Sequence, residues 1–163
     1  MLYDRATTVC FTGHRTYDGS RNEQLAEAVR ELYGRGYRTF LSGMAVGFDL
    51  AAAEVVLTLR AELADLRLVA VVPFVGTEER FSSRDAMRFR TVLATANEVV
   101  ELAQCYTPDT YHRRNDFLVD NSSAIIAYFD GSKGGTAYTV RRATKNRLQV
   151  INIYDDPQTK LIF

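Results

Sequence analysis

The sequence, 163 residues long, lacks several features that would point directly to a partner or a location. Its 20 lysines and arginines balance 20 aspartates and glutamates, so the overall charge favours neither nucleic acid nor an anionic membrane. No apolar run approaches the roughly 20 residues of a membrane-spanning helix, and no signal peptide is recognisable. These absences predict a cytoplasmic protein with no membrane partner.

Metal chemistry is poorly supported. The two cysteines, Cys10 and Cys105, lie in or beside apolar segments without the spacing of metal ligands, so we expect two buried free thiols. The two histidines, His14 and His112, are too few to form a zinc site alone. We therefore expect no metal site and no required cofactor.

The strong fingerprints of nucleotide enzymes are missing as well. The glycine-rich segment 131–136 does not have the spacing of a G-x-x-x-x-G-K-[ST] loop, which argues against a P-loop NTPase. No G-x-G-x-x-G motif follows the first apolar run, which argues against an ordinary dinucleotide dehydrogenase. The G-x-S-x-G elbow of a serine hydrolase is also absent.

What the chain contains is a regular alternation of short apolar runs and segments with helical periodicity. The apolar runs predict strands at 8–12, 38–42, 66–73, 98–102, 124–129 and 149–154. The periodic segments predict helices at 22–35, 50–64, 83–95, 109–122 and 136–147. Ser20 and Glu23 form a capping-box signal at the start of the first helix. The pattern predicts one α/β domain over residues 1–163, doubly wound, with a mainly parallel sheet of about six strands and helices on both faces.

In such a sheet, ligands bind outside the carboxyl ends of the strands, so the loops that follow the strands are the candidate sites. The segment Asp130–Thr136 follows the fifth strand and opens into a helix. Its glycines and the helix N-terminus form a generic anion site. After the first strand come Gly13, His14 and Arg15. Arg15 either pairs with a phosphate or carboxylate, or remains a solvated loop residue.

The loop after the second strand contains Ser42, Gly43, Gly47 and Asp49. Its two glycines, four residues apart, resemble a phosphate or ribose cradle. Asp49 either caps the following helix or accepts hydrogen bonds from ribose hydroxyls.

Two further intervals carry side chains suited to a ligand. After the third strand, Phe74 either stacks on a base or closes the loop over the core, while Glu78 and Glu79 are candidates to act on a sugar. Before the fifth strand, Arg113 and Arg114 either reach the same pocket or lie on a solvated helix face.

Together these motifs resemble the YpsA/YspA-like family of the SLOG superfamily, which also contains the Lonely-guy (LOG) phosphoribohydrolases and the DNA-processing protein DprA. The resemblance covers roughly residues 8 to 154 and rests on five ordered segments: Phe11–Arg15, Ser42–Asp49, Pro73-Phe74, Arg114-Asn115 with Val119-Asp120, and Tyr128–Thr136.

The resemblance implies a Rossmann-like fold that binds a nucleotide or a nucleotide-derived ligand. Gly134–Thr136 match the phosphate-binding segment of the LOG enzymes, and Arg114 has the spacing of an arginine that they use. In those enzymes a glutamate just after the threonine helps to cleave the base–ribose bond, whereas Ala137–Thr139 follow here. The resemblance therefore extends to the phosphate-binding half of the site, whereas the glutamate of the hydrolytic half has no counterpart after Thr136.

The prediction is a protein that binds a nucleotide-type phosphate ligand, such as AMP, ADP-ribose or an NAD-like molecule, as a sensor or regulator without strong catalysis. The expected ligand-binding residues are Gly13, His14, Arg15, Ser42, Gly43, Gly47, Asp49, Phe74, Asp130, Gly131, Gly134, Gly135 and Thr136.

Two other functions stay open. One is a LOG-like phosphoribohydrolase that cleaves the N-glycosidic bond of a nucleoside monophosphate, with Arg114, Glu78 and Glu79 as the catalytic residues. The other is a DprA-like association with DNA, against which the zero net charge argues, so nucleic acid is not an expected partner. The LOG relatives also imply a homodimer.

Overall fold

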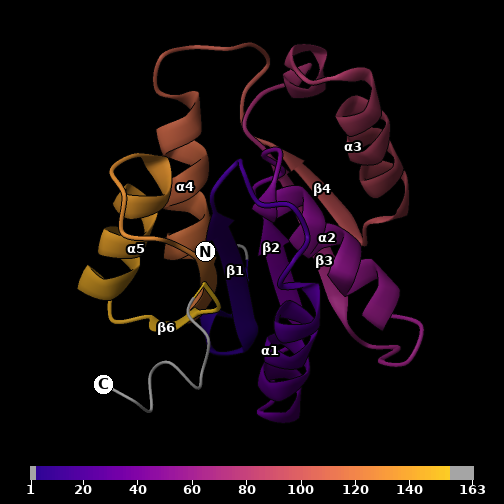
Figure 1. Ribbon diagram of the computed structural model, residues 1–163, viewed down its shortest axis with the longest axis vertical. Helices are drawn as coiled ribbons and strands as arrows, with labels where there is room; N and C mark the ends of the chain where they lie inside the picture. The colour runs from indigo at the N-terminus through magenta and orange to yellow at the C-terminus, as the bar shows by residue number, and fades with distance from the viewer. Residues whose placement is uncertain (1–2, 155–163) are drawn as a thin grey trace.

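Six strands form one sheet in which every pair of neighbours is parallel, in the order β4-β3-β2-β1-β5-β6. The computed structural model describes residues 3–154 (Figure 1). The strands are β1 (Thr8–Gly13), β2 (Thr39–Ser42), β3 (Arg67–Val72), β4 (Glu98–Glu101), β5 (Ala124–Tyr128) and β6 (Gln149–Asn152). The α-helices are α1 (Asn22–Gly34), α2 (Phe48–Leu59), α3 (Ser83–Thr95), α4 (Thr110–Asp120) and α5 (Gly135–Lys145), and two short 3-10 helices are η1 (Arg5–Thr7) and η2 (Thr77–Arg80).

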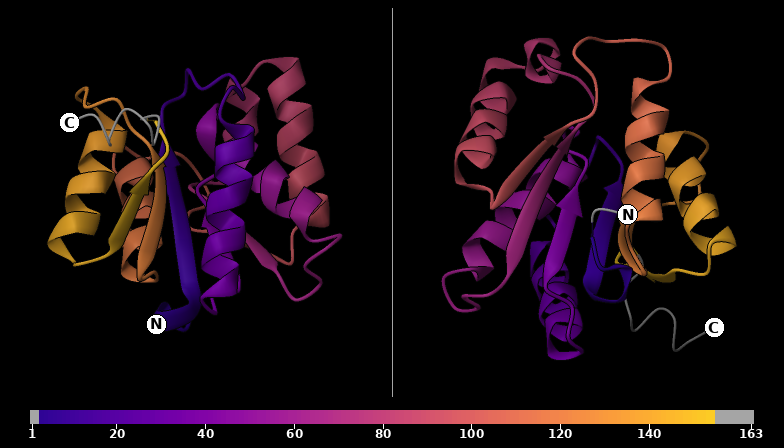
Figure 2. Two further views of the ribbon diagram at one scale, coloured as in Figure 1. Left: turned by 60° about the horizontal axis from the view of Figure 1, so that its bottom comes forward. Right: turned by 180° about the vertical axis from the view of Figure 1, so that it is seen from behind.

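Helices cover both faces of the sheet, with α1, α2 and α3 on one side and α4 and α5 on the other (Figures 1 and 2). The alternation of side chains along β1 follows this arrangement. Val9 and Phe11 join the core on the side of α1 and α2, whereas Cys10 joins Leu118 and Ala143 under α4 and α5. Strands that are covered on both faces need apolar residues at nearly every position, which is why they read as continuous apolar runs. The predicted doubly wound α/β fold is confirmed.

The chain order changes direction between β1 and β5. From β1 to β4 each new strand is added on one side, and the connection through α4 then returns the chain to the other side of β1. The register pairs Gly13 with Tyr128, so the loops that leave β1 and β5 start side by side. Because those loops run to helices on opposite faces, a crevice opens between them at the carboxyl edge of the sheet.

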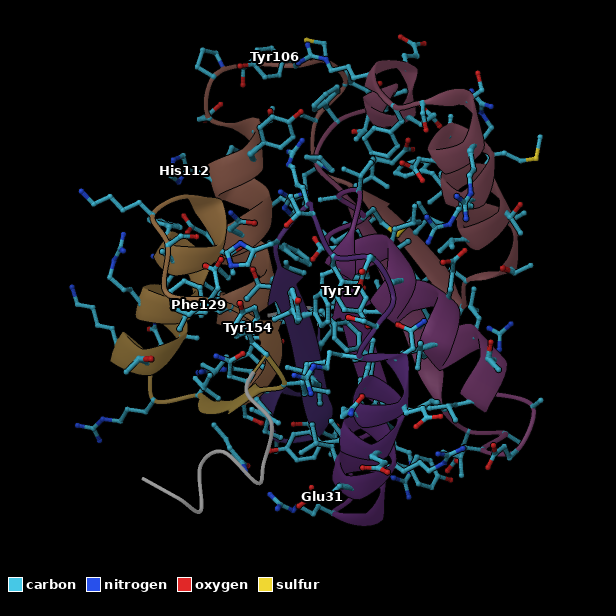
Figure 3. All side chains as sticks on the ribbon, in the orientation of Figure 1. Tyr17, Glu31, Tyr106, His112, Phe129 and Tyr154 are labelled. Atoms are coloured by element: carbon cyan, nitrogen blue, oxygen red, sulfur yellow. The ribbon has the colours of Figure 1, made fainter. Side chains whose placement is uncertain are left out.

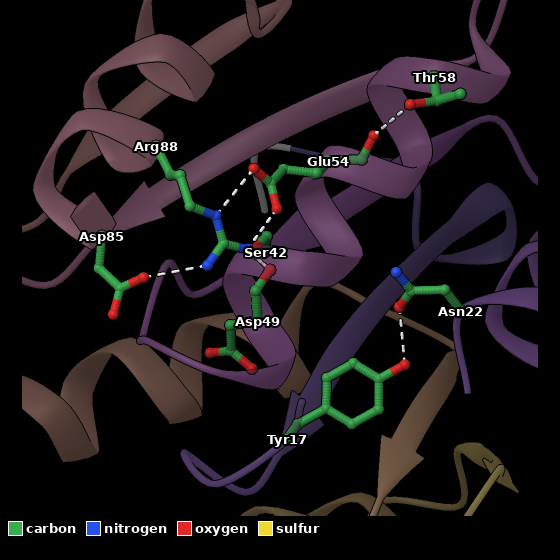
Figure 4. Close-up of polar contacts among 8 residues, drawn as sticks. All are labelled: Tyr17, Asn22, Ser42, Asp49, Glu54, Thr58, Asp85 and Arg88. Carbon is green, nitrogen blue, oxygen red and sulfur yellow. Dashed lines mark hydrogen bonds and ion pairs between the residues drawn. The ribbon is translucent and has the colours of Figure 1, made fainter. Parts of the chain in front are cut away.

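The start of α1 differs from its predicted form. The N-cap is Arg21, without a side-chain hydrogen bond, so the capping box expected from Ser20 and Glu23 is wrong. The hydroxyl of Tyr17 stabilises the helix start instead, because it accepts a hydrogen bond from the Arg21 amide at 3.0 Å. The same hydroxyl donates to Asn22 Oδ1 at 2.7 Å (Figure 4).

Three other local predictions are also corrected. Helix α2 begins at Phe48 after the N-cap Gly47, so Asp49 lies inside the first turn and does not cap it. The helix also ends at Leu59, earlier than the periodicity indicates. Cys10 is buried as expected, whereas Cys105 is exposed in the loop before α4.

Residues 1–2 and 155–163, which the predicted domain includes, lie outside the described part of the chain. Among residues 3–154, no helix is both long and apolar enough to cross a bilayer.

The loop into α2 lies against the loop that follows β1, where Gly47 meets Arg15. Gly47 has a φ of 80°, and a Cβ atom there would lie 2.5 Å from the carbonyl oxygen of Arg15. Gly47→Ala must therefore push the two loops apart, and we expect it to lower the free energy of unfolding by about 3 kcal/mol in urea denaturation.

Gly36→Ala is the matched control, because Gly36 also has a positive φ of 103° but, apart from its chain neighbours, no atom of residues 3–154 lies within 4 Å of its added Cβ. That variant carries only the backbone cost of about 1 kcal/mol. Equal losses in the two variants would contradict a steric role for Gly47.

Candidate functional site

A cavity of about 330 Å³ opens at the carboxyl edge of the sheet, between the loops that follow β1 and β5. Its volume is that of a small-ligand pocket. Four segments build it: the end of β1 with its loop, the loop into α2, the first turns of α4, and the loop into α5. The residues that line it are Thr12, Gly13, His14, Arg15, Ala45, Asp49, Tyr111, Arg114, Asn115, Lys133, Gly134, Gly135 and Thr136.

One wall of the cavity is the N-terminus of α5. The N-cap residue, Gly134, has no side chain to accept the first helical amides, and no acidic residue occurs in the first turn. The amides at this end are therefore left for another acceptor, and the helix dipole adds partial positive charge. A negatively charged group on the ligand is the natural partner.

Arg114 forms the buried cationic part of the cavity. The residue is only 6% exposed. Its Nη1 donates to the carbonyl oxygen of Gly43 at 2.7 Å, and its Nε donates to Asn115 Oδ1 at 2.8 Å. Within residues 3–154, no carboxylate oxygen lies within 4.0 Å of its nitrogens. Burial lowers the pKa of Arg114, but a guanidinium stays charged at neutral pH, so the cavity holds a buried positive charge that acts on Asp49 without forming an ion pair with it.

The position of Arg114 depends on Gly43. A Cβ atom at residue 43 would lie 2.6 Å from Arg114 Cδ and 3.0 Å from Asp49 Oδ2. Gly43 itself does not line the cavity. It makes room for the side chains of Arg114 and Asp49 and accepts a hydrogen bond through its carbonyl.

Asp49 is the one carboxylate among the lining residues. It is 5% exposed, and none of the described protein groups donates a hydrogen bond to its Oδ1. Burial raises the pKa of Asp49 to about 6, although Arg114, the Ala45 amide and Arg15 each act to lower it. The group is thus a buried acceptor whose charge is only partly compensated.

His14 joins the two loops beside the cavity. Its Nε2 accepts the backbone N–H of Asp130 at 3.0 Å and lies 2.8 Å from Asp130 Oδ1. The same Oδ1 accepts from the amide and the hydroxyl of Ser132, which lower the pKa of Asp130. Asp130 therefore shapes the loop and does not face the cavity, whereas His14 lines it.

Tyr111 provides the aromatic part of the cavity. The guanidinium carbons of Arg15 and Arg114 lie 5.7 and 5.5 Å from its ring centroid, within the range of cation–π contacts. Behind it, Phe74 is 3% exposed and meets Tyr106 and Tyr111 edge-on at 5.7 and 5.9 Å. Figure 3 shows Tyr106 on the loop between β4 and α4. Phe74 is thus a support for Tyr111 and does not line the cavity.

The structure brings eight of the predicted residues together around the cavity: Gly13, His14, Arg15, Asp49, Arg114, Gly134, Gly135 and Thr136. It places the others outside the lining: Ser42, Gly43, Gly47, Phe74, Glu78, Glu79, Asp130 and Gly131. Ser42 is buried, where its hydroxyl donates to the main-chain oxygen of Asp49 (Figure 4).

Glu78 and Glu79, the predicted catalytic carboxylates, lie on η2 after β3. A Cβ atom built on Gly76 would lie 3.4 Å from the Glu79 carboxyl group, so that side chain folds back on its own loop. β3 is separated from β5 by β2 and β1, which explains why its loop does not reach the cavity.

The prediction of site residues omitted Thr12, Ala45, Tyr111, Asn115 and Lys133. Residues three and four apart on a helix share a face, so the spacing of Tyr111, Arg114 and Asn115 could have identified the two neighbours of the arginine. Lys133 directly precedes the two glycines at the start of α5.

The raised pKa of Asp49 predicts a specific dependence of stability on pH. The pKa is about 6 in the folded protein and about 4 in an unfolded chain, so the folded state binds this proton more tightly. The resulting stability is present below pH ~4 and is lost as the pH rises through ~6, by about 3 kcal/mol at most.

Urea denaturation at pH 4 and pH 7.5 tests this for the wild type and Asp49→Asn. The variant should lack this loss of stability between pH 4 and pH 7.5. Arg114 without a nearby carboxylate also lowers the stability of the variant, but equally at both pH values, so the difference between them is not affected. Parallel changes in the two proteins would show that Asp49 titrates normally.

The comparisons with known proteins agree with this fold. The model of the YspA SLOG family matches residues 20–155. The SPbeta prophage-derived protein YoqJ of Bacillus subtilis (strain 168) is 27% identical over 140 residues, which cover 77% of this chain and 81% of YoqJ. A UPF0398 protein of Bacillus thuringiensis (strain Al Hakam) is 27% identical over 111 residues, which cover 67% of this chain but only 60% of that protein.

Two solved structures of DNA processing protein A share the fold. The protein from Helicobacter pylori, described for its single-stranded DNA binding mode, superposes with a TM-score of 0.63 at 19% identity over 88% of this chain and 63% of its own. DprA from Streptococcus pneumoniae has a TM-score of 0.63 at 16% identity over 95% of this chain and 55% of its own. The sequence predicts that nucleic acid is not a partner. These comparisons do not support that prediction.

The family match spans most of the chain, including the loop into α2, Arg114 on α4 and the loop into α5. The protein belongs to the YspA SLOG family.

Proposed function

We propose that this protein binds the phosphate group of a nucleotide-type small molecule in the cavity between the β1 and β5 loops, as a binding protein or sensor without strong catalysis. The observation that carries the proposal is the buried guanidinium of Arg114, which has no carboxylate within ion-pair distance in residues 3–154. A buried charge without a counter-ion is costly, and a bound anion removes that cost.

The charges around the cavity favour an anion. Arg15, Arg114 and Lys133 line it against the single carboxylate of Asp49. The uncapped N-terminus of α5 adds partial positive charge on the side of Lys133 and Gly134. A phosphate placed there would receive backbone amides from the helix and charge-assisted hydrogen bonds from the side chains.

The size and polarity of the cavity favour a ligand that is larger than inorganic phosphate. A volume of about 330 Å³ leaves room for a sugar beside the phosphate. The amide of Asn115 and the carboxylate of Asp49 supply polar contacts, and the ring of Tyr111 supplies an aromatic one. AMP, ADP-ribose and NAD are the ligands to test.

The geometry favours binding over glycosidic hydrolysis. The first turn of α5 has no acidic residue, and Glu78 and Glu79 do not line the cavity. A general acid or base must come within hydrogen-bond reach of the reacting group, directly or through one water. A LOG-like phosphoribohydrolase reaction through those two glutamates is therefore the weaker proposal.

Arg114→Gln tests the proposed site. We expect wild-type protein to bind at least one of AMP, ADP-ribose and NAD in isothermal titration calorimetry and to show a higher Tm in its presence. In Arg114→Gln the affinity should fall about 30-fold, because a charge-assisted hydrogen bond from a buried side chain contributes roughly 2 kcal/mol.

Arg113→Gln is the control on the same helix, because the Arg113 side chain is exposed and does not line the cavity. A single-stranded oligonucleotide is titrated in parallel, as DprA from Helicobacter pylori is described as binding single-stranded DNA. No stabilisation by any nucleotide at millimolar concentration, or equal binding by Arg114→Gln and wild type, would overturn the proposal. Salt-sensitive binding of the oligonucleotide alone would replace it with a nucleic-acid function.

A further inference from the structure

The carboxylate of Asp49 is unfavourable in a cavity that binds only a phosphate group. Its carboxylate shares the cavity with Arg15, Arg114 and Lys133, and its negative charge opposes a second negative charge on a ligand in the same cavity. It also interacts electrostatically with Arg114 and thereby reduces the attraction of that residue for an anion. The carboxylate of Asp49 therefore needs a hydrogen-bond donor that a phosphate group does not supply.

The partner of Asp49 Oδ1 is not one of the described protein groups. That oxygen is buried and accepts no hydrogen bond from them. Two nearby side chains donate elsewhere: Ser42 Oγ donates to the main-chain oxygen of Asp49, and Nη1 and Nε of Arg114 donate to Gly43 and Asn115. A buried acceptor without a donor is destabilising. Asp49 lines the cavity, so a small rotation of its carboxylate toward a donor on a ligand would relieve this.

The side chain points to the cavity side of α2. Figure 4 shows the Asp49 carboxylate turned away from Glu54, which pairs with Arg88 on the opposite side of the helix. Asp49 lines the cavity, whereas Glu54 does not. The two carboxylates of this helix therefore have different surroundings, and only Asp49 is available to a ligand in this cavity.

The charges in the cavity limit which chemical group of a ligand can donate a hydrogen bond to Asp49. An ammonium group is disfavoured because Arg15 and Arg114 already contribute positive charge at the cavity. A neutral hydroxyl donates one hydrogen bond without adding charge. In a nucleotide, the group next to the phosphate is the sugar, and the phosphate site at the start of α5 lies in the same cavity of about 330 Å³.

We infer that Asp49 accepts a hydrogen bond from a sugar hydroxyl of the ligand, so that the cavity selects ribonucleotides over the corresponding deoxyribonucleotides. The inference rests on the proposed function and adds the sugar to it. Asp49 is a specificity-determining residue here: it weakens the binding of phosphate alone and strengthens the binding of a phosphate that is attached to a ribose.

The test compares AMP, 2′-deoxy-AMP, 3′-deoxy-AMP and inorganic phosphate by calorimetry at pH 7.5. Wild-type protein should bind AMP about 10-fold or more tightly than at least one of the deoxy compounds, the effect expected when a charged acceptor loses its donor. In Asp49→Ala this ratio should fall close to one, while inorganic phosphate should bind more tightly than it does to the wild type.

Asp49→Asn provides a second variant should the alanine variant fail to fold. It removes the charge but keeps an acceptor oxygen, so it should bind phosphate more tightly and retain part of the preference for AMP. Glu54→Gln is the control on the same helix and should leave both the ratio and the phosphate affinity unchanged.

The outcomes separate the inference from the proposed function. Equal binding of AMP and both deoxy compounds by wild type, with the loss of affinity in Arg114→Gln intact, would overturn the inference alone. An unchanged phosphate affinity in Asp49→Asn would also overturn it. Failure of all the nucleotides to bind would overturn the proposed function, and the inference with it.

Discussion

The hydrogen bond from Arg114 Nη1 to the carbonyl oxygen of Gly43 fixes a buried charge at the edge of the sheet. A guanidinium that is 6% exposed is costly to desolvate, and this carbonyl and the side-chain oxygen of Asn115 offset only part of the cost. The bond requires that residue 43 has no Cβ, and it holds α4 against the loop into α2. The shape of the cavity and its charge therefore depend on the same contact.

The topology explains why this contact occurs where it does. Helix α4 belongs to the connection that carries the chain from β4, at the edge of the sheet, to β5, beside β1. The face of its first turns that carries Tyr111, Arg114 and Asn115 is brought to the crevice where the loops of β1 and β5 part. The N-terminus of α5 reaches the same place because α5 follows β5 directly. A doubly wound sheet thus gathers an arginine, a helix N-terminus and two loops that are far apart in the sequence.

The strands and helices were predictable because both faces of the sheet are covered, which makes strands continuously apolar and helices amphipathic. The start of α2 was not predictable from the sequence, because it depends on a long-range contact. The backbone of Gly47 lies against that of Arg15, and the helix begins directly after this contact. Glu78 and Glu79 were chosen for their chemistry, but distance from the cavity depends on strand order, and β3 lies two strands from β1. Helical spacing relates Tyr111 to Arg114, but its contact with Arg15 follows only from packing in three dimensions.

The placement of acidic groups around this cavity is the feature that distinguishes the two proposed activities, binding and hydrolysis. The side chain after Ala137 on α5 is Tyr138, and its hydroxyl donates to Asp116 on α4 at 2.8 Å, so it is engaged in holding the two helices together. The carboxylate of Asp49 enters from α2, on the other side of the sheet from α5. A group in that position can contact the sugar of a ligand whose phosphate lies on α5, while the side chains that follow Thr136 supply no acid or base. Recognition of the sugar and of the phosphate can therefore coexist in one cavity that lacks the carboxylate used by the LOG enzymes.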